Sequence, residues 1–260
     1  MKKIQGIIIL LAALLACLTS CSRYDSAGDF EIITAEAGRS TEIAAYIGRN
    51  QVVSIPPRIK RSPVTVIGEG AFHRRNLTSV TIPDSVNNIR SGAFAGNRLE
   101  SVTIPGSVTR LGNAVFHENL LESITLPDGL LGIGNSAFAG NRLSSVTIPG
   151  SVLVIGGQAF AMNQISTLLI GDGVNYIDYA AFFGNRLESI IIPPSVTGIS
   201  EQAFARNQIR LVVIGANVEF ESEEWSSAID NGFDEFYRSN GSLAGTYTLN
   251  GDVWIFTPQY

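Results

Sequence analysis

The chain has 260 residues, of which 45% are hydrophobic and 16% are charged, and its formal net charge is −5. This composition is typical of a globular protein with one or two domains. The acidic balance argues against a nucleic-acid partner, because a protein that binds nucleic acid presents a basic patch.

The first 20 residues have the pattern of an export signal. Lys2 and Lys3 precede an unbroken apolar run over residues 7–18. This run is too short for a membrane-spanning helix, which needs about 20 apolar residues. We therefore interpret residues 1–20 as a signal peptide and leave them out of the predicted fold.

Residues 18–21, Leu-Thr-Ser-Cys, resemble the lipobox of bacterial lipoproteins. The resemblance implies that Cys21 is lipidated and begins the mature protein, and that Ser22 after it directs the protein to the outer membrane. Cys17 would leave with the signal, so the mature protein would hold no disulfide and no free thiol. The alternative is a buried or disulfide-bonded Cys21. Without residues 1–20 the chain has 16 basic and 23 acidic residues, a formal charge of −7.

The segment before the regular repeats is expected to tether and cap the fold. We interpret residues 21–29 as the lipidated cysteine and a polar tether, and residues 30–71 as an N-terminal cap with a degenerate first repeat. Residues 53–56, Val-Ser-Ile-Pro, imitate the strand motif of the later repeats, but about five extra residues follow around Arg58–Pro63. A cap is needed because the first coil of a solenoid otherwise exposes its core.

Phenylalanine recurs every 22 residues through the centre of the chain, at positions 72, 94, 116, 138, 160, 182 and 204. The pattern L-x-x-V-x-I precedes each next phenylalanine with the same period, which is the signature of a leucine-rich-repeat solenoid. Burying the apolar side chains of one unit contributes ~10–18 kcal/mol, whereas ordering its backbone costs about 1–2 kcal/mol per residue. One repeat alone is therefore unstable, and stacked repeats share a core.

Each unit has the same predicted local structure. Ser-Val-Thr-Ile alternates and is β-branched, which predicts a short strand that a proline or glycine ends. A second apolar pair then returns inward, and Ala-Phe is expected to open a helical turn that closes near Gly-Asn. The predicted fold is an α/β-type solenoid dominated by short parallel strands, with seven regular units over residues 72–215 and a cap at each end.

A column of asparagines stands just before the predicted strands, and it admits two interpretations. In one, the amides point inward and bond to the backbone of adjacent coils. In the other, each asparagine is a surface residue in a left-handed turn. The column consists of Asn97, Asn119, Asn141, Asn163, Asn185 and Asn207.

The motif I-P-x-S-V-x-x-I-G-x-x-A-F resembles the BspA-like leucine-rich repeats of bacteria, over roughly residues 50–215. The resemblance implies a secreted or lipid-anchored surface protein of a host-associated bacterium, with adhesion to host proteins or to other bacteria as its role. The commonest leucine-rich repeats place Asn or Cys after the strand, where this chain has mostly Ser or Gly. Binding rules of eukaryotic receptors are therefore not transferred.

Residues 216–260 lose the period and are expected to form a C-terminal cap. Apolar residues recur at near-helical spacing over residues 221–237, and Asn-Gly separates two strand-like runs in residues 246–256. The first pattern predicts a helix, and the second predicts a hairpin. The alternative to a cap is a recognition module that includes Trp225 and Trp254.

The exposed face of the predicted strands is the candidate binding surface. Hydroxyl side chains occupy it in the first four regular units, and aliphatic side chains replace them in the last three. An exposed apolar patch marks an interaction site, unless the C-terminal cap folds back over it. The candidate contact residues are Thr125, Thr147, Leu169, Ile191, Leu211 and Val213.

The sequence shows little that points to catalysis. His73 and His117 share a repeat position but lack a third ligand for zinc, and the repeated Glu100, Glu122 and Glu188 fit a solvated edge. Hydrolase, metalloprotease and phosphate-loop motifs are absent, so we expect no enzyme, cofactor or metal. The leading hypothesis is a lipid-anchored surface module that binds a host or bacterial protein. The alternative is a periplasmic or envelope scaffold without an external ligand.

Overall fold

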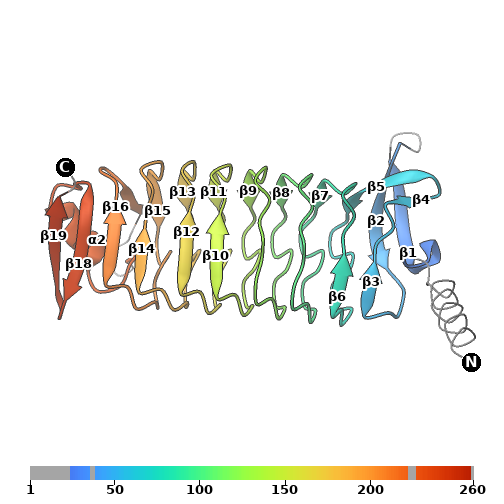
Figure 1. Cartoon of the computed structure of the whole chain (residues 1–260), viewed down its shortest axis with the longest axis horizontal. Helices are drawn as coiled ribbons and strands as arrows, with labels where there is room; N and C mark the ends of the chain where they lie inside the picture. The colour runs from blue at the N-terminus through green and yellow to red at the C-terminus, as the bar shows by residue number, and fades with distance from the viewer. Residues whose placement is uncertain (1–23, 36–38, 222–226, 259–260) are drawn as a thin grey trace, which may run out of the picture.

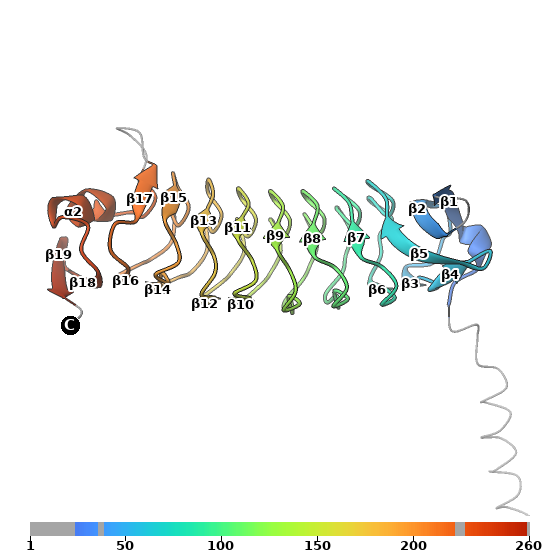
Figure 2. The ribbon, with the colours of Figure 1, turned by 90° about the horizontal axis from the view of Figure 1, so that it is seen from above.

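The computed structural model describes residues 24–35, 39–221 and 227–258. It confirms the predicted solenoid, as a stack of about eight coils with 22-residue spacing. The coils contribute short strands to two rows, which Figure 2 shows along opposite sides of the stack. Because the period is constant, each repeat position lies beside its equivalent in the next coil.

The front row, facing the viewer in Figure 1, holds the Ser-Val-Thr strands. Its strands pair in parallel, with Thr147 opposite Leu169 and Ile191 opposite Val213. The strands are β3 (Val52–Ser54), β6 (Ser79–Thr81), β10 (Ser145–Ile148), β12 (Thr167–Ile170), β14 (Ser189–Ile191) and β16 (Leu211–Ile214), with a bridge between Thr103 and Thr125 where two coils lack a full strand.

The back row is one sheet of eleven strands. Most are only two residues long, with one inward side chain in each, as in β8, where Leu111 is buried and Arg110 is exposed. They are β1 (Phe30–Ala35), β2 (Ser40–Tyr46), β4 (Arg58–Ile59), β5 (Ser62–Ile67), β7 (Asn88–Ile89), β8 (Arg110–Leu111), β9 (Gly132–Ile133), β11 (Val154–Ile155), β13 (Tyr176–Ile177), β15 (Gly198–Ser200) and β17 (Glu219–Glu221).

The third side of each coil is a turn that is not helical. The sequence-based prediction of a helical turn here is wrong. Across residues 72–215, all of which the structure describes, there is no α-helix. The N–H of Ala93 bonds within its own coil, to the carbonyl of Arg90, but the N–H of Phe94 bonds to the carbonyl of Val115 in the next coil. This alternation links neighbouring coils, which an α-helix would prevent because its interior N–H groups bond within the helix.

The repeated phenylalanines form a continuous stack in the core. All seven are fully buried, and consecutive rings lie 5.0–5.6 Å apart between centroids. Tyr46 extends the stack into the N-terminal segment, 5.4 Å from Phe72. The Tyr46 ring thereby supplies the aromatic layer that a preceding repeat would otherwise supply.

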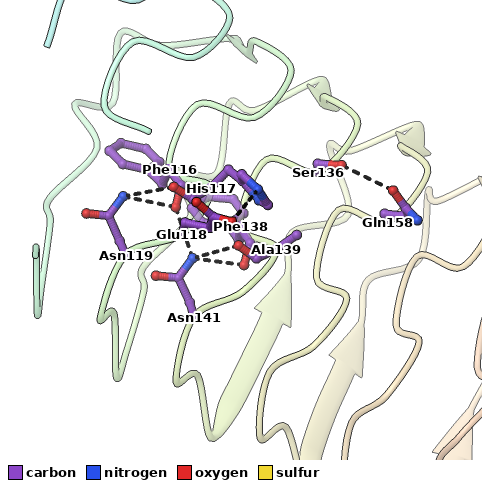
Figure 3. A network of polar contacts seen from close by, with 9 residues as sticks. All are labelled: Phe116, His117, Glu118, Asn119, Ser136, Phe138, Ala139, Asn141 and Gln158. Carbon is purple, nitrogen blue, oxygen red and sulfur yellow. Dashed lines mark hydrogen bonds and ion pairs between the residues drawn. The ribbon is translucent and has the colours of Figure 1, made fainter. Parts of the chain in front are cut away.

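The asparagine column is the inward ladder, and the surface-turn interpretation is wrong. Figure 3 shows the amides of Asn119 and Asn141 donating to backbone carbonyls of the turn. Asn119 Oδ1 accepts from the N–H of Leu99 at 3.1 Å, and its Nδ2 donates to the carbonyls of Phe94 and Phe116 at 2.9 and 3.2 Å. Each amide thus bonds to backbone groups that the regular strand pairing leaves unpaired.

The N-terminal segment departs from the expected tether. Residues 27–29 form a short 3-10 helix, and the Asp25 carboxylate accepts from Asn50 Nδ2 at 2.7 Å and from the N–H of Ser54 at 2.6 Å. Asp25 is therefore docked on the first coil, because its carboxylate satisfies groups at the edge of β3. The extra residues near Arg58–Pro63 form a tight hairpin between β4 and β5.

The C-terminal segment contains a helix and a hairpin. The helix α2 (Phe233–Ser239) covers only the last part of the range 221–237 that the spacing predicts. Glu221 ends β17, residues 222–226 lie outside the described residues, and residues 228–232 form bends and turns. The predicted hairpin is confirmed as β18 (Gly245–Asn250) and β19 (Val253–Pro258). Asp230 closes the last turn: Asp230 Oδ2 accepts from the N–H of Arg206 at 2.7 Å.

Candidate functional site

The candidate contact residues lie on neighbouring coils of the front row, five of them in strands and Thr125 at its bridge with Thr103. Thr125 and Thr147 are exposed on the hydroxyl part of the face. Leu169 is 56% exposed and Ile191 is 61% exposed, while Leu211 is less exposed and Val213 is half-buried. We call Leu169, Ile191, Leu211 and Val213 the aliphatic patch.

The C-terminal hairpin does not cover the aliphatic patch. β18 instead pairs with β16 in antiparallel fashion, with Thr248 opposite Leu211 and Thr246 opposite Val213. The hairpin therefore prolongs the sheet sideways, as the orange and red end of Figure 1 shows. The expectation that a cap folds back over this face is wrong, because the hairpin satisfies the edge of β16 rather than its exposed surface.

The hairpin adds two exposed residues that the sequence did not assign to this surface. Ile255 is opposite Thr248, on the same face as Leu211, and is 49% exposed. Val253 lies two positions earlier on the same strand and is also exposed. The repeat period ends before both residues, so only the pairing of β18 with β16 reveals that they continue the patch.

Charged and polar side chains border the patch on one side. A cleft of about 440 Å³ is lined there by Glu188, Gln208, Arg210 and Asp252, together with Leu249. The patch itself has no charged residue. An apolar centre with a polar rim is the usual arrangement of a protein-binding surface.

Trp254 belongs to the core and does not form a recognition module. Its side chain is buried, its ring lies 5.0 Å from that of Phe233, and its Nε1 donates to the carbonyl of Asn231 at 3.0 Å. Burial also raises the pKa of the neighbouring Tyr247 to about 12. Trp225, the other residue of that hypothesis, lies outside the described residues, as does Cys21.

Three side chains form a polar cluster on the back row: Tyr176 of β13, Ser200 of β15 and Glu221 of β17. The Glu221 carboxylate accepts from the hydroxyls of Tyr176 and Ser200. Burial and the hydrogen bond to Glu221 raise the pKa of Tyr176, and the two hydroxyl donors lower the pKa of Glu221. These bonds hold β17 against β13 and β15, so we assign the cluster to the closure of the back row.

Other candidate groups are dispersed. His117 Nε2 lies 3.5 Å from the carboxylate of Glu118, as Figure 3 shows. Within residues 24–35, 39–221 and 227–258, no three His, Cys, Asp or Glu side chains come together in a way that could hold a metal ion. In the same part of the chain, no helix has the length and apolar character needed to cross a membrane.

A second exposed aliphatic pair lies on the back row. Leu131 and Leu153 are 41% and 51% exposed, and the N–H of Leu153 donates to the carbonyl of Leu131 at 3.1 Å. This pair is smaller than the aliphatic patch and provides a natural comparison for it.

The geometry and the repeat together identify the family. A family model described as a BspA-type leucine-rich-repeat region, in six copies, matches residues 53–165 and 111–225. The chain belongs to this family. The BspA-type match confirms the family expected from the repeat motif, and it does not test the lipid anchor.

Two solved structures illustrate what the BspA-type chain is similar to. A leucine-rich-repeat protein from Bacteroides ovatus is 28% identical, with a TM-score of 0.68 over 75% of this chain. The pneumococcal vaccine antigen PcpA is 21% identical, with a TM-score of 0.52 over 73% of this chain, a likeness of fold alone. The matches cover 54% and 49% of those proteins, so this chain spans about half of their length. A comparison with curated proteins found no match.

Proposed function

We propose that the protein is a lipid-anchored bacterial surface module that binds another protein through the C-terminal half of its front row. The exposed side chains of Leu169 and Ile191 are the observation that supports this proposal most strongly. They lie at the same repeat position of neighbouring coils, and the C-terminal hairpin prolongs the sheet that holds Ile191 without covering it. Burying them against a partner would remove apolar surface from water, which is the main favourable contribution to protein association.

The shape of this surface favours a protein over a small molecule. The front row is an extended sheet whose side chains alternate between core and solvent, and a deep apolar cavity is the usual site for a small ligand. Thr125 and Thr147 prolong the contact face with hydroxyl groups that donate and accept hydrogen bonds. We propose a broad contact in which the aliphatic patch supplies affinity and the hydroxyl part extends the area, with no catalytic step.

The anchor completes the proposal. A lipid at Cys21 would hold the N-terminal end of the stack at the membrane, because residues 24–29 lead directly to the first coil. The strands β12, β14 and β16, which carry the aliphatic patch, lie in the half of the stack farther from the N-terminus in Figure 1. This polarity presents the patch away from the membrane, where a host matrix protein or a bacterial surface protein can reach it.

The test is the double variant Leu169→Ser/Ile191→Thr, measured for binding to a panel of immobilised host matrix proteins and to whole bacterial cells. We expect affinity to fall at least about tenfold, since two exposed apolar anchors are lost, with an almost unchanged melting temperature. The matched control is Leu131→Ser/Leu153→Thr on the back row, which should keep full binding. Equal binding by the two double variants would contradict the proposed site.

A further inference from the structure

The C-terminal hairpin leaves one edge of the front row open. β19 is the last strand, and within the described residues it pairs with β18 alone. One hydrogen bond fixes the direction of the backbone groups: the N–H of Leu249 donates to the carbonyl of Arg210, just before β16, at 2.8 Å. The backbone groups of Leu249 therefore face β16. Successive residues of a strand direct their N–H and C=O groups to opposite sides. The backbone groups of Thr246, Thr248 and Asn250 consequently point towards β19.

The outward groups of β19 follow from its register with β18. Thr257, Ile255 and Val253 lie opposite the three β18 residues that point towards them, so their backbone groups face β18. Trp254 and Phe256 consequently direct their N–H and C=O groups out of the sheet edge. An unpaired edge of this kind is a template for another strand.

At the other three ends of the two rows, the outermost described strand carries or contacts a charged side chain. At the opposite end of the front row, the Asp25 carboxylate accepts a hydrogen bond from the N–H of Ser54 in β3. In the back row, β17 contains Glu219 and Glu221, and β1 contains Glu31. Charged residues on edge strands oppose unwanted pairing. β19, with the sequence Val-Trp-Ile-Phe-Thr-Pro, has no charged residue.

We propose that β19 pairs antiparallel with β19 of a second copy of this chain, about a two-fold axis at Ile255. In this register Trp254 of each copy lies opposite Phe256 of the other. Each outward N–H of these two residues then has a carbonyl partner, and the interface is isologous, as in most symmetric dimers.

Pro258 selects this register over a neighbouring one. An axis at Phe256 would place Trp254 opposite Pro258, which has no N–H to donate. The carbonyl of Trp254 would then lose its partner in both copies. An axis at Ile255 keeps all of the pairing within residues 253–257, where every residue has an N–H group.

The pairing would join the sheets β14-β16-β18-β19 of the two copies into one continuous sheet. Ile255, which is 49% exposed, would lie opposite its equivalent, with the Cβ atoms about 4.5–5.5 Å apart in a non-hydrogen-bonded pair. The two aliphatic patches would then share one surface. This inference does not depend on the proposed ligand, but it predicts that a surface-bound protein engages its partner with two linked sites, which raises avidity.

The test uses charge at the predicted axis, with the full chain purified in mild detergent and studied by sedimentation velocity over a concentration series. The wild-type chain is expected to dimerise. Ile255→Lys and Ile255→Glu should each weaken the dimer about tenfold or more, because like charges then lie directly opposite each other. An equimolar mixture of the two variants should restore dimerisation, because opposite charges face each other in the mixed pair.

Val253 provides the matched control on the same strand. It is exposed, uncharged and β-branched, but in the proposed register it lies opposite Thr257 of the copy rather than its own equivalent. Val253→Lys should therefore keep most of the dimer.

Ile255→Cys should form a disulfide-linked dimer on mild oxidation, and Val253→Cys should not. A wild-type chain that stays monomeric throughout, or a mixture that fails to rescue the Ile255 variants, would overturn the proposal.

Discussion

The side-chain oxygen of Asn119 accepts a hydrogen bond from the backbone N–H of Leu99, one coil earlier, at 3.1 Å. The same asparagine donates to the carbonyl of Phe94 in that earlier coil and to Phe116 in its own. A single amide therefore connects two coils at the point where the turn becomes a strand. The equivalent amide of Asn141 repeats this arrangement one coil later.

Removing one rung of this ladder should destabilise the solenoid. Asn141→Ala would leave the N–H of Leu121 and the carbonyls of Phe116 and Phe138 without these partners. Each buried unpaired group costs about 1–3 kcal/mol, so the three groups together predict a loss of about 3–9 kcal/mol in urea unfolding. Asn87→Ala, at an exposed position, is the control and should change stability little. Equal stability of both variants would show that the ladder is unimportant.

The phenylalanine stack should make unfolding cooperative along the chain. Phe138 lies in the middle of the stack and is fully buried, so Phe138→Ala should cost about 3–5 kcal/mol. Because each coil is stabilised by its neighbours, the variant should also uncouple the two halves. Denaturation followed by far-ultraviolet circular dichroism should broaden or split into two transitions, and a single sharp transition at the wild-type midpoint would contradict this expectation.

The C-terminal cap should contain a pH-sensitive group. Burial raises the pKa of Asp234, although the N–H groups of Ala228 and Ile229 oppose this by donating to its carboxylate. Because the folded pKa is raised, the stabilisation is present below the ordinary value of 3.8 and is lost as pH rises through the folded pKa. The difference in melting temperature between the wild type and Asp234→Asn should therefore shift against the wild type as pH rises through this range. A constant difference would contradict the raised pKa.

The proposed anchor makes a prediction about membrane association. Cys21→Ser should release the protein from the membrane fraction of cells, because the variant has no thiol to accept a lipid at that position. Cys17→Ser, within the apolar run that we interpret as the signal, should leave the anchor in place. Fractionation of cells with metabolic labelling by a fatty acid distinguishes these outcomes. Equal labelling of the Cys21 variant and the wild type would exclude this residue as the anchor.

Periodicity alone predicted much of the fold and part of the site. The 22-residue period places Leu169 and Ile191 on the same face because each coil repeats the same alternation of inward and outward side chains. It could not place Ile255, whose position depends on antiparallel pairing between β18 and β16, long after the period ends. It also left a recognition module open as the alternative to a cap for Trp254, because the period does not determine the contacts of aromatic residues beyond the repeats.

The proposed helical turn shows a different limit of the sequence. Ala-Phe followed by Gly-Asn fits the end of a helix by local preference. In the folded chain, however, alternate N–H groups of this segment bond to the next coil. Contacts between coils therefore override the local tendency, and no single repeat contains the information needed to predict them.

The most direct test of the proposed surface role is protease treatment of intact cells, followed by detection of this protein before and after mild disruption of the outer membrane. If the solenoid is presented outside the cell, the protein should be lost from intact cells while a periplasmic marker survives. If the protein survives until the outer membrane is opened, the solenoid is periplasmic. The surface-binding proposal would then give way to an envelope scaffold without an external ligand.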